Sequence, residues 1–409
     1  MIFNTWAYAV FLAVAFVLYW LAPARARGAV LTALGFFFYA YYHPPHVLLI
    51  AATIPLMTWI GVRVATGPIP ERRRWLALGT ALCLGALAFY KYQAFFIEVA
   101  GDLLRPLGRT IDVRAMELRP PLGISFFVFE YVHYLVESFR GTVAPASLPQ
   151  LGLFIMFFPT LICGPIKRYN RFHPEEAAAR LDAAGVAEGL RRILVGLAKK
   201  TLVADQVAPL CAPILLHPDR YQTAMLWAGV YGYAMQIYFD FAGYSDIAIG
   251  SARLFGYQVP ENFNYPYLQP NIARFWRAWH MSLTSWITDY VYIPLGGSRR
   301  GELRGAANRL ASMTLCGLWH GAALHFAAWG LYHGVALNVY RGWQRVRVRV
   351  FGWPAEATHP LGRLVATIVT FHVVCIGWVL FVCDFHRPFT GSDQPGIGQD
   401  FYDRFNRSG

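Results

Sequence analysis

Residues 5–22 read TWAYAVFLAVAFVLYWLA, an apolar stretch without a single charged side chain. About 18 such residues are enough for a helix to cross the hydrocarbon core of a bilayer. Similar apolar stretches recur along the chain, at 28–42, 46–66, 75–100, 121–138, 150–166, 223–255, 305–340 and 362–383. The sequence is 56% hydrophobic and 14% charged, whereas soluble domains are about 25% charged. These features predict an all-α, polytopic membrane protein with roughly nine to eleven transmembrane helices.

Basic residues in the loops predict the orientation of the chain. Arg25 and Arg27 follow the first apolar stretch, and no charged residue precedes it. Because cytoplasmic loops carry an excess of Lys and Arg, the N-terminus is predicted to face the periplasm. Beyond residue 138, simple alternation would place Lys167 and Arg168 outside. Some central segments are therefore predicted to be re-entrant.

The net charge of +13 does not point to nucleic acid as a partner. The basic residues lie in short loops between apolar stretches rather than on one polar face, which favours cytoplasmic loops beside the headgroups of the lipid bilayer. The six cysteines contain no Cys-x-x-Cys, and the twelve histidines show no HExxH spacing. The sequence therefore predicts neither a disulfide framework nor a metal site.

Two polar segments are expected to have structure of their own. Residues 174–200 place Leu190, Leu194 and Leu197 on one helical stripe beside basic residues, which suits a helix in the membrane interface or a cytoplasmic loop helix. Residues 256–274 hold three prolines and three asparagines. Because proline breaks helices, this segment is predicted to be a structured loop, suited to lining a cavity.

Carboxylates within the apolar stretch QIYFDFAGYSDIAIG (236–250) are candidates for a polar site. Asp240 and Asp246 flank Gly243 and Tyr244, and a carboxylate that faces lipid is costly. Both should therefore face a protein interior or a water-filled cavity. They form either a polar site near a catalytic chamber or a pair of buried structural carboxylates bonded to Tyr, Ser or Arg.

A first Trp-His pair, Trp279-His280, lies in RFWRAWHMSLTSWITDYVYIPLGG (274–297). Helical spacing would put Trp276 and Arg277 on the face of the imidazole of His280. A guanidinium so close would disfavour imidazolium and keep the ring neutral, ready to accept a proton. The alternative is a core histidine bonded to a backbone carbonyl.

A second pair, Trp319-His320, lies in TLCGLWHGAALHFAAWG (314–330). Gly317 and Gly321 form a small-xxx-small pattern, which lets another backbone approach closely. Such an approach would bury the imidazole of His320 and leave a ligand as its main partner. His325 and His333, farther along, are expected to be packing or interfacial residues.

Six motifs occur in order between residues 121 and 340: PLGISFFVFEYVHYLVESFRG, FPTLICGPIKRY, QIYFDFAGYSDIAIG, PENFNYPY, FWRAWHMSLTSWITDYVYIPLGG and LWHGAALHFAAWGLYHG. Together they closely resemble the membrane-bound O-acyltransferases, in the bacterial branch of alginate O-acetylation proteins, with the teichoic-acid D-alanylation protein as a more distant relative. The resemblance implies a ring of helices with re-entrant segments around a central tunnel.

This resemblance also implies roles for individual residues. His320 matches the histidine taken as catalytic in the family, and His280 matches a second required residue. The candidates for lining the tunnel or contacting substrate are Trp276, Arg277, Trp279, Asp289, Tyr290, Trp319, Asp240, Tyr244 and Asp246. No cofactor is expected to be bound, and the implied acyl donor is acetyl-CoA or another acyl thioester that enters from the cytoplasm.

The chain departs from the family pattern at several positions. Ala278 and Thr288 stand where the family usually has Arg, and His325 stands where it usually has Asn. Residues 384–409 form a short polar tail in place of further helices. The tail predicts either a shortened variant or a frame-disrupted copy with reduced activity.

The expected function is transfer of an acetyl or similar short acyl group from a cytoplasmic thioester toward an extracytoplasmic polysaccharide such as alginate. Residues 1–409 are expected to form one domain in the cell inner membrane, working with a periplasmic acetyltransferase-type partner protein. Two alternatives remain open from the sequence. One is an inactive scaffold subunit of an exopolysaccharide modification complex, and the other is a proton-coupled transporter or flippase, although the chain shows no repeat symmetry.

Overall fold

The structure is a computed structural model, and it describes residues 3–42, 44–104, 120–162, 164–172 and 181–382. Within these ranges the chain is helical and contains no β-strand, as the sequence predicts. The contacts divide the chain into two compact units. Unit 1 comprises Met1–Leu197 and Gly243–Pro260, and unit 2 comprises Ala198–Ala242 and Glu261–Gly409. Helix α11 (Thr223–Leu254) contributes to both units. The predicted single domain is not tested by this division.

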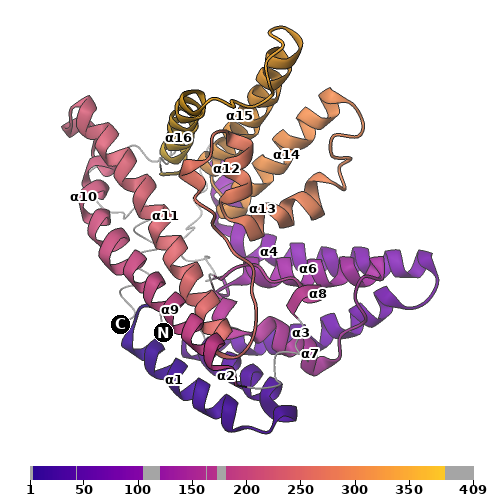
Figure 1. Ribbon diagram of the computed structural model, residues 1–409. Helices are drawn as coiled ribbons and strands as arrows, with labels where there is room; N and C mark the ends of the chain where they lie inside the picture. Colours follow the sequence, from indigo (N-terminus) through magenta and orange to yellow (C-terminus); the bar gives the residue numbers. More distant parts are fainter. Residues whose placement is uncertain (1–2, 43, 105–119, 163, 173–180, 383–409) are drawn as a thin grey trace. The chain divides into compact units, whose positions relative to one another are not determined.

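Unit 1 is built from the N-terminal helices (Figure 1). They are α1 (Trp6–Leu21), α2 (Arg27–Tyr42), α3 (Pro44–Ala65), α4 (Ile69–Leu104), α6 (Ile124–Arg140), α7 (Leu148–Met156), α8 (Tyr169–Phe172) and α9 (Ala183–Ala198), with the end of α11. Short 3₁₀ turns occur at Ala24–Ala26 and Phe158–Thr160.

Glycines set the packing of α9 against α11 in unit 1. A Cβ on Gly196 would lie 2.6 Å from the carbonyl oxygen of Gly243, and one on Gly189 would lie 2.9 Å from that of Gly250. Neither helix can therefore carry a larger residue at these positions without moving. Leu190 and Leu194 of α9 are exposed, which agrees with a helix in the membrane interface. The alternative of a cytoplasmic loop helix stays open.

One basic residue that seemed to mark a loop is buried in unit 1. Lys167 is 1% exposed, and its Nζ lies 2.6 Å from Oε1 of Glu130 and 2.9 Å from Oγ1 of Thr160. The ammonium also lies 5.1 Å from the ring centroid of Phe154. Lys167 lies in a buried connection before α8 and its charge is paired, so it does not report an exposed cytoplasmic loop and cannot be used in the positive-inside argument. The failure of simple alternation at this residue does not by itself require a re-entrant segment.

Unit 2 contains the remaining helices. They are the π-helical segment η4 (Lys199–Ala204), α10 (Asp205–Leu216), the start of α11, α12 (Ile272–Ala278), α13 (Met281–Ile287), the π-helical segment η7 (Thr288–Tyr292), α14 (Glu302–His320), α15 (Leu324–Arg349) and α16 (Pro360–Val382). Short 3₁₀ turns occur at Pro218–Arg220 and Pro266–Leu268.

Helices α14 and α15 form a tight hairpin in unit 2 (Figure 1). A Cβ on Gly317 would lie 2.0 Å from the carbonyl oxygen of Phe326, and one on Gly330 would lie 2.2 Å from that of Met313. The prediction that Gly317 permits a close backbone approach is confirmed. The apolar stretch 305–340 is thus two helices, as expected.

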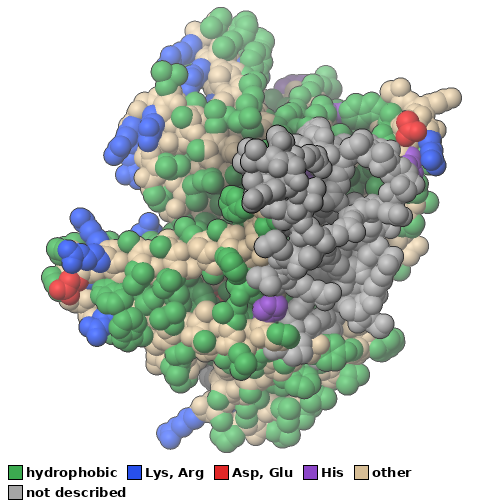
Figure 2. Space-filling model, turned by 180° about the vertical axis from the view of Figure 1, so that it is seen from behind, with side chains coloured by type: hydrophobic (Ala, Val, Ile, Leu, Met, Phe, Trp, Pro, Cys, Tyr) green, Lys and Arg blue, Asp and Glu red, His purple; other side chains and the backbone are tan. Residues whose placement is uncertain are grey.

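Exposed apolar side chains agree with a membrane protein. On the face shown in Figure 2, hydrophobic side chains cover much of the described surface, and Lys and Arg gather in a few patches. Among the described residues, three helical segments are long and apolar enough to cross a membrane: Pro45–Ala65, Ile69–Gln93 and Pro360–Val382. Trp6–Leu21 is a shorter apolar helix. The count of nine to eleven passes, the ring and the tunnel therefore stay predictions.

Candidate active site

The chain breaks between α12 and α13 at the first Trp-His pair. Helix α12 ends at Ala278, Trp279 is extended, and His280 has a left-handed backbone with φ of 42° before α13 begins. The predicted helical spacing from Trp276 and Arg277 to His280 is therefore wrong. A left-handed residue other than glycine costs free energy, and it persists where its surroundings hold it in place.

The polar loop 255–271 supplies these surroundings. The backbone N–H of Met281 donates to the carbonyl of Asn262 at 2.9 Å, and that of Asn264 donates to the carbonyl of Ala278 at 3.0 Å. The chain is thereby hydrogen-bonded to the loop both before and after the break. The prediction of a structured loop at 256–274 is confirmed, and the role of this loop is to fix the backbone on both sides of His280.

Asn262 also contacts the imidazole directly. Its Oδ1 lies 3.3 Å from Nδ1 of His280 and accepts a hydrogen bond from Oγ of Ser282 at 2.6 Å. With Oδ1 as the acceptor, Nδ1 of His280 carries the hydrogen and Nε2 carries the lone pair. Asn262, His280 and Ser282 are all buried. This arrangement leaves Nε2 as the nitrogen that can accept a proton or a hydrogen bond.

Burial keeps the imidazole of His280 neutral. The residue is 2% exposed, and this burial lowers its pKa well below the ordinary value. The sequence predicted a neutral ring, but it assigned the cause to Arg277. That side chain is exposed, and loss of solvent around the imidazole is the cause instead.

His320 occupies a different environment, at the last residue of α14. Its ring centroid lies 4.9 Å from that of Trp319, 5.3 Å from that of Trp329 and 5.2 Å from that of Phe381. The imidazole is half-buried rather than fully buried. The expectation that the close glycine contact would bury His320 tightly is wrong, because Gly317 brings α15 against the backbone of α14 and leaves the helix end partly open.

Trp319 contacts both histidines. Its ring centroid is 6.1 Å from that of His280 and 4.9 Å from that of His320. The two separations together limit the distance between the imidazole centroids to about 11 Å. Both histidines therefore belong to one site in unit 2, within reach of a single substrate. Their catalytic roles stay predictions.

Two of the tryptophans predicted to line the site, Trp276 and Trp279, pack against other aromatic rings of unit 2. Trp276 packs at 5.6 Å from Trp329 and 5.0 Å from His333, and Trp279 packs at 4.9 Å from Trp378. His333 is 0% exposed and His325 is 1% exposed, as expected of packing residues. These rings give the site a rigid apolar side.

The other predicted residues divide between the two units. Asp289 and Tyr290 are half-buried in the π-helical segment η7, a type of local distortion that is frequent at functional sites. Tyr244 and Asp246 belong to unit 1, where Asp246 forms an ion pair with Arg192 of α9 at 2.5 Å. This pairing supports the structural interpretation of Asp246.

Asp240 forms an ion pair, which supports the structural interpretation of this carboxylate. Its Oδ1 lies 2.5 Å from Nζ of Lys200, and the same ammonium lies 2.7 Å from Oδ1 of Asp205. The next residue, Phe241, packs edge-on against the ring of His280 at 4.7 Å. The ion pair of Asp240 and the ring contact of Phe241 thus lie at neighbouring residues of α11.

Sequence reasoning missed Asn262, Ser282 and Phe241. The run PENFNYPY was interpreted as a loop and as a family motif, but no partner was assigned to Asn262, although a buried asparagine needs a hydrogen-bonding partner. A search for polar residues two positions from a candidate histidine would have found Ser282. Within the described residues, no group of three His, Cys, Asp or Glu side chains could hold a metal ion.

Comparison with known proteins identifies the family. The profile of the MBOAT, membrane-bound O-acyltransferase family, matches residues 74–382. The chain belongs to the membrane-bound O-acyltransferase family. It is 36% identical over 367 residues to the "Probable alginate O-acetylase AlgI" of Azotobacter vinelandii, covering 89% of this chain and 71% of that protein.

Two further relatives of this O-acyltransferase modify other polymers according to their names. The "Peptidoglycan O-acetyltransferase" of Helicobacter pylori is 31% identical over 416 residues, which cover 93% of this chain and 77% of that protein. The "Teichoic acid D-alanyltransferase" of Bacillus subtilis is 33% identical over 276 residues, which cover 64% of this chain and 68% of that protein. The chain is therefore an O-acyltransferase of a family that includes enzymes named for cell-envelope polymers.

Proposed function

We propose that this acyltransferase moves an acetyl or similar short acyl group from a cytoplasmic thioester such as acetyl-CoA across the membrane for O-acetylation of an extracytoplasmic polysaccharide such as alginate. The observation that carries the proposal is the pair of histidines that both contact Trp319, with the His280 ring neutral and bonded to Asn262. The names of the relatives support the class of acceptor.

In the proposed reaction His320 is the general base. It accepts the proton of the acceptor hydroxyl while the hydroxyl oxygen attacks the carbonyl carbon of the thioester. The carbon–sulfur bond then breaks, and the leaving thiolate takes that proton as a thiol. A positioned base is worth about 10²–10⁴-fold in rate, and the half-buried end of α14 leaves His320 room for a substrate.

His280 has a positioning role in this proposal. Because Nδ1 faces Asn262, Nε2 is left to accept a hydrogen bond from the acceptor and to orient it toward the thioester. The acceptor is a hydroxyl of the polysaccharide or of a periplasmic acetyltransferase-type partner that completes the transfer.

The direct test places the purified full chain in lipid vesicles loaded with radiolabelled acetyl-CoA. It measures transfer of the labelled acetyl group to alginate outside the vesicles. His320→Ala should lower transfer by about 10²–10⁴-fold, whereas His372→Gln, on α16 of the same unit, should retain it. If the protein were a transporter, neither wild type nor His320→Ala would show acetyl transfer, and His320→Ala would lose the flux of a transported solute. Wild-type transfer by His320→Ala at equal protein level would refute the proposed base, and a wild-type protein without transfer would favour an inactive scaffold.

The proposed direction of transfer requires a defined topology. We place the chain in the cell inner membrane with its N-terminus in the periplasm, because Arg25 and Arg27 follow the first apolar helix and no basic residue precedes it. Asn4→Cys should react with a membrane-impermeant thiol reagent in intact spheroplasts. Reaction only after permeabilisation would reverse this orientation.

A further inference from the structure

Aromatic rings surround the imidazole of His320 in unit 2. Besides Trp319, the preceding residue, they belong to Trp329 of α15 and Phe381 of α16, whose ring centroids lie 5.3 Å and 5.2 Å from that of the imidazole. Both rings stand nearly at right angles to the imidazole, at 87° and 81°. Phe326 of α15 lies farther away, at 6.4 Å. Any group that reacts at His320 is therefore bordered by rings from α14, α15 and α16.

Two of these rings are fixed by close packing, and Phe381 differs from them. Phe326 is 3% exposed and Trp329 is 1% exposed. A Cβ on Gly321 would lie 2.1 Å from the ring of Phe326, so the backbone passes directly against that ring. Phe381 packs on both, at 5.0 Å from Phe326 and 5.3 Å from Trp329. Like His320, it keeps part of its surface exposed. Of the three, Phe381 is the ring that is both in contact with the imidazole and partly exposed.

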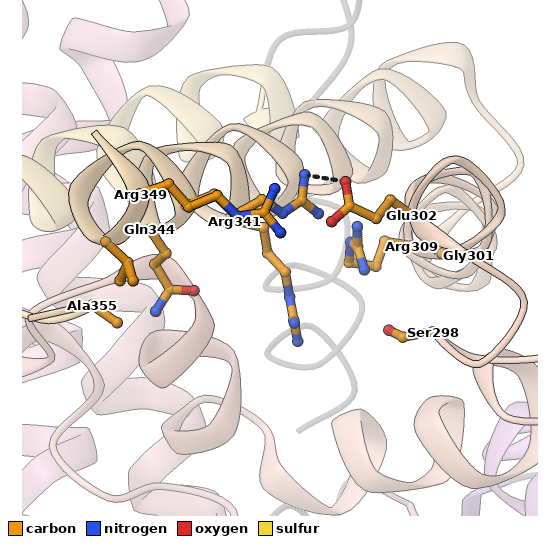
Figure 3. Close-up of a pocket in the computed structure, with 11 residues that line it drawn as sticks. Ser298, Gly301, Glu302, Arg309, Arg341, Gln344, Arg349 and Ala355 are labelled. Carbon is orange, nitrogen blue, oxygen red and sulfur yellow. Dashed lines mark ion pairs between the residues drawn. The ribbon is translucent and has the colours of Figure 1, made fainter. Parts of the chain in front are cut away.

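A wider cleft of unit 2 lies away from His320. Its volume is about 490 Å³, and it lies between the start of α14 and the end of α15 (Figure 3). Arginines are prominent in its lining, which includes Arg309, Arg341, Arg345 and Arg349. The lining shares no residue with the aromatic rings around His320. This polar cleft therefore does not supply room for an apolar chain beside the imidazole.

We propose that Phe381 limits the length of the acyl chain that this enzyme transfers. The inference rests on the proposed function, in which the acceptor hydroxyl is hydrogen-bonded to His320 and attacks the thioester carbonyl. A hydrogen bond to a general base is about 2.6–3.2 Å long, and the carbonyl carbon is the next atom. The acyl chain therefore begins beside the rings around His320. The methyl of an acetyl group needs little room there, whereas each added methylene needs space that the ring of Phe381 occupies.

The test compares acyl donors of different length in the same protein. The purified full chain is placed in lipid vesicles loaded with acetyl-, butyryl- or hexanoyl-CoA, and transfer to alginate outside is measured. The readout is the ratio of kcat/KM for butyryl-CoA to that for acetyl-CoA, which does not depend on the amount of active protein. Phe381→Ala should raise this ratio by about tenfold or more, because one methylene in an apolar site is worth about 10–200-fold. Phe381→Leu, which removes less volume, should raise it by a smaller factor.

The matched control is Phe371→Ala, on the same helix. Phe371 is also partly exposed, and its ring packs at 5.8 Å from Tyr231 and 5.3 Å from Tyr267. This variant should keep the wild-type ratio. An equal rise in Phe371→Ala and Phe381→Ala would indicate general loosening of α16 and overturn the role of Phe381. An unchanged ratio in Phe381→Ala would overturn it as well.

Further outcomes separate this inference from the proposed function. If Phe381→Ala does not fold, Phe381→Leu decides, and an unchanged ratio in that variant rejects the inference. Loss of transfer from every donor in folded Phe381→Leu would mean that the ring supports His320 itself and does not select the acyl chain. Equal kcat/KM for acetyl- and hexanoyl-CoA in wild type would also reject the inference while leaving acyl transfer established. A wild type that transfers no donor would refute the proposed function, and the inference with it.

Discussion

His280 and His320 each follow a tryptophan, yet the two residues are held in different ways. His280 is fully buried at a left-handed break, where Oδ1 of Asn262 accepts a hydrogen bond from its ring and the carbonyl of Asn262 accepts one from the backbone N–H of Met281. His320 ends a long helix, is half-buried and packs among aromatic rings. The difference indicates a division of labour in which one histidine is oriented in advance and the other is accessible to substrate.

The largest expected effect is the loss of acyl transfer when either histidine is removed. The two variants should differ in the free energy of unfolding. His320→Ala should lower acyl transfer by about 10²–10⁴-fold with little change in unfolding, because its imidazole is half-buried. His280→Ala should also lose transfer, but it leaves Asn262 short of a partner and should cost about 1–3 kcal/mol of unfolding free energy. Thermal unfolding in detergent, measured beside acetyl transfer, checks both. Equal loss of stability in the two variants would remove the distinction.

The next effect tests whether Asn262 orients His280. Asn262→Ala should reduce acyl transfer by about 10²-fold, because displacing a positioning group by about 1 Å can lower the rate by that factor. Asn262→Asp keeps an acceptor for Nδ1 and should recover part of the rate. Single-turnover rates at saturating donor separate this loss from weaker binding. If both variants transfer at the wild-type rate, His280 does not depend on this contact.

A third experiment concerns the helix end that carries His320. Gly317→Ala would place a Cβ 2.0 Å from the carbonyl oxygen of Phe326, and overpacking of this kind typically costs about 1–3 kcal/mol. Gly342→Ala, on α15 with no atom within 4 Å of the new Cβ, is the matched control and should not destabilise the protein. Unfolding by heat or denaturant compares the two. If Gly317→Ala left the stability unchanged, α14 and α15 could move apart at Gly317 without loss of free energy.

The sequence predicted the helical class, the division of 305–340 into two helices and the loop at 256–274, because these depend on local composition. It did not predict the break at His280. That break depends on the hydrogen bond from Met281 to Asn262, which lie 19 positions apart, and local periodicity carries no record of such a contact. The burial of Lys167 was not predicted for the same reason, because its partner Glu130 lies 37 positions away in the sequence.

The candidate site was predicted in part. The two histidines could be proposed because a titratable residue in apolar sequence is unusual, and the structure brings both into contact with Trp319. Asp246 could not be separated from Asp240 by sequence, although Asp246 pairs with Arg192 within unit 1 and Asp240 pairs with Lys200 within unit 2. The polar tail at 384–409 lies outside the described residues, so the expectation attached to it stays a prediction.

The smallest effect concerns the response of stability to pH. Burial lowers the pKa of His280, whereas a histidine in an unfolded chain titrates near about 6.5. Below about pH 6.5 the unfolded state therefore binds a proton that native His280 does not. The free energy of unfolding should fall as the pH falls, by at most about 1.4 kcal/mol per pH unit for this one residue. His280→Asn should weaken that dependence between about pH 6.5 and pH 5, although it lowers stability at every pH. Ser282→Ala loses a hydrogen bond to Asn262 but no titratable group, so it should keep the wild-type slope. If His280→Asn kept that slope as well, native His280 would be protonated, and it could not act as the neutral group that orients the acceptor.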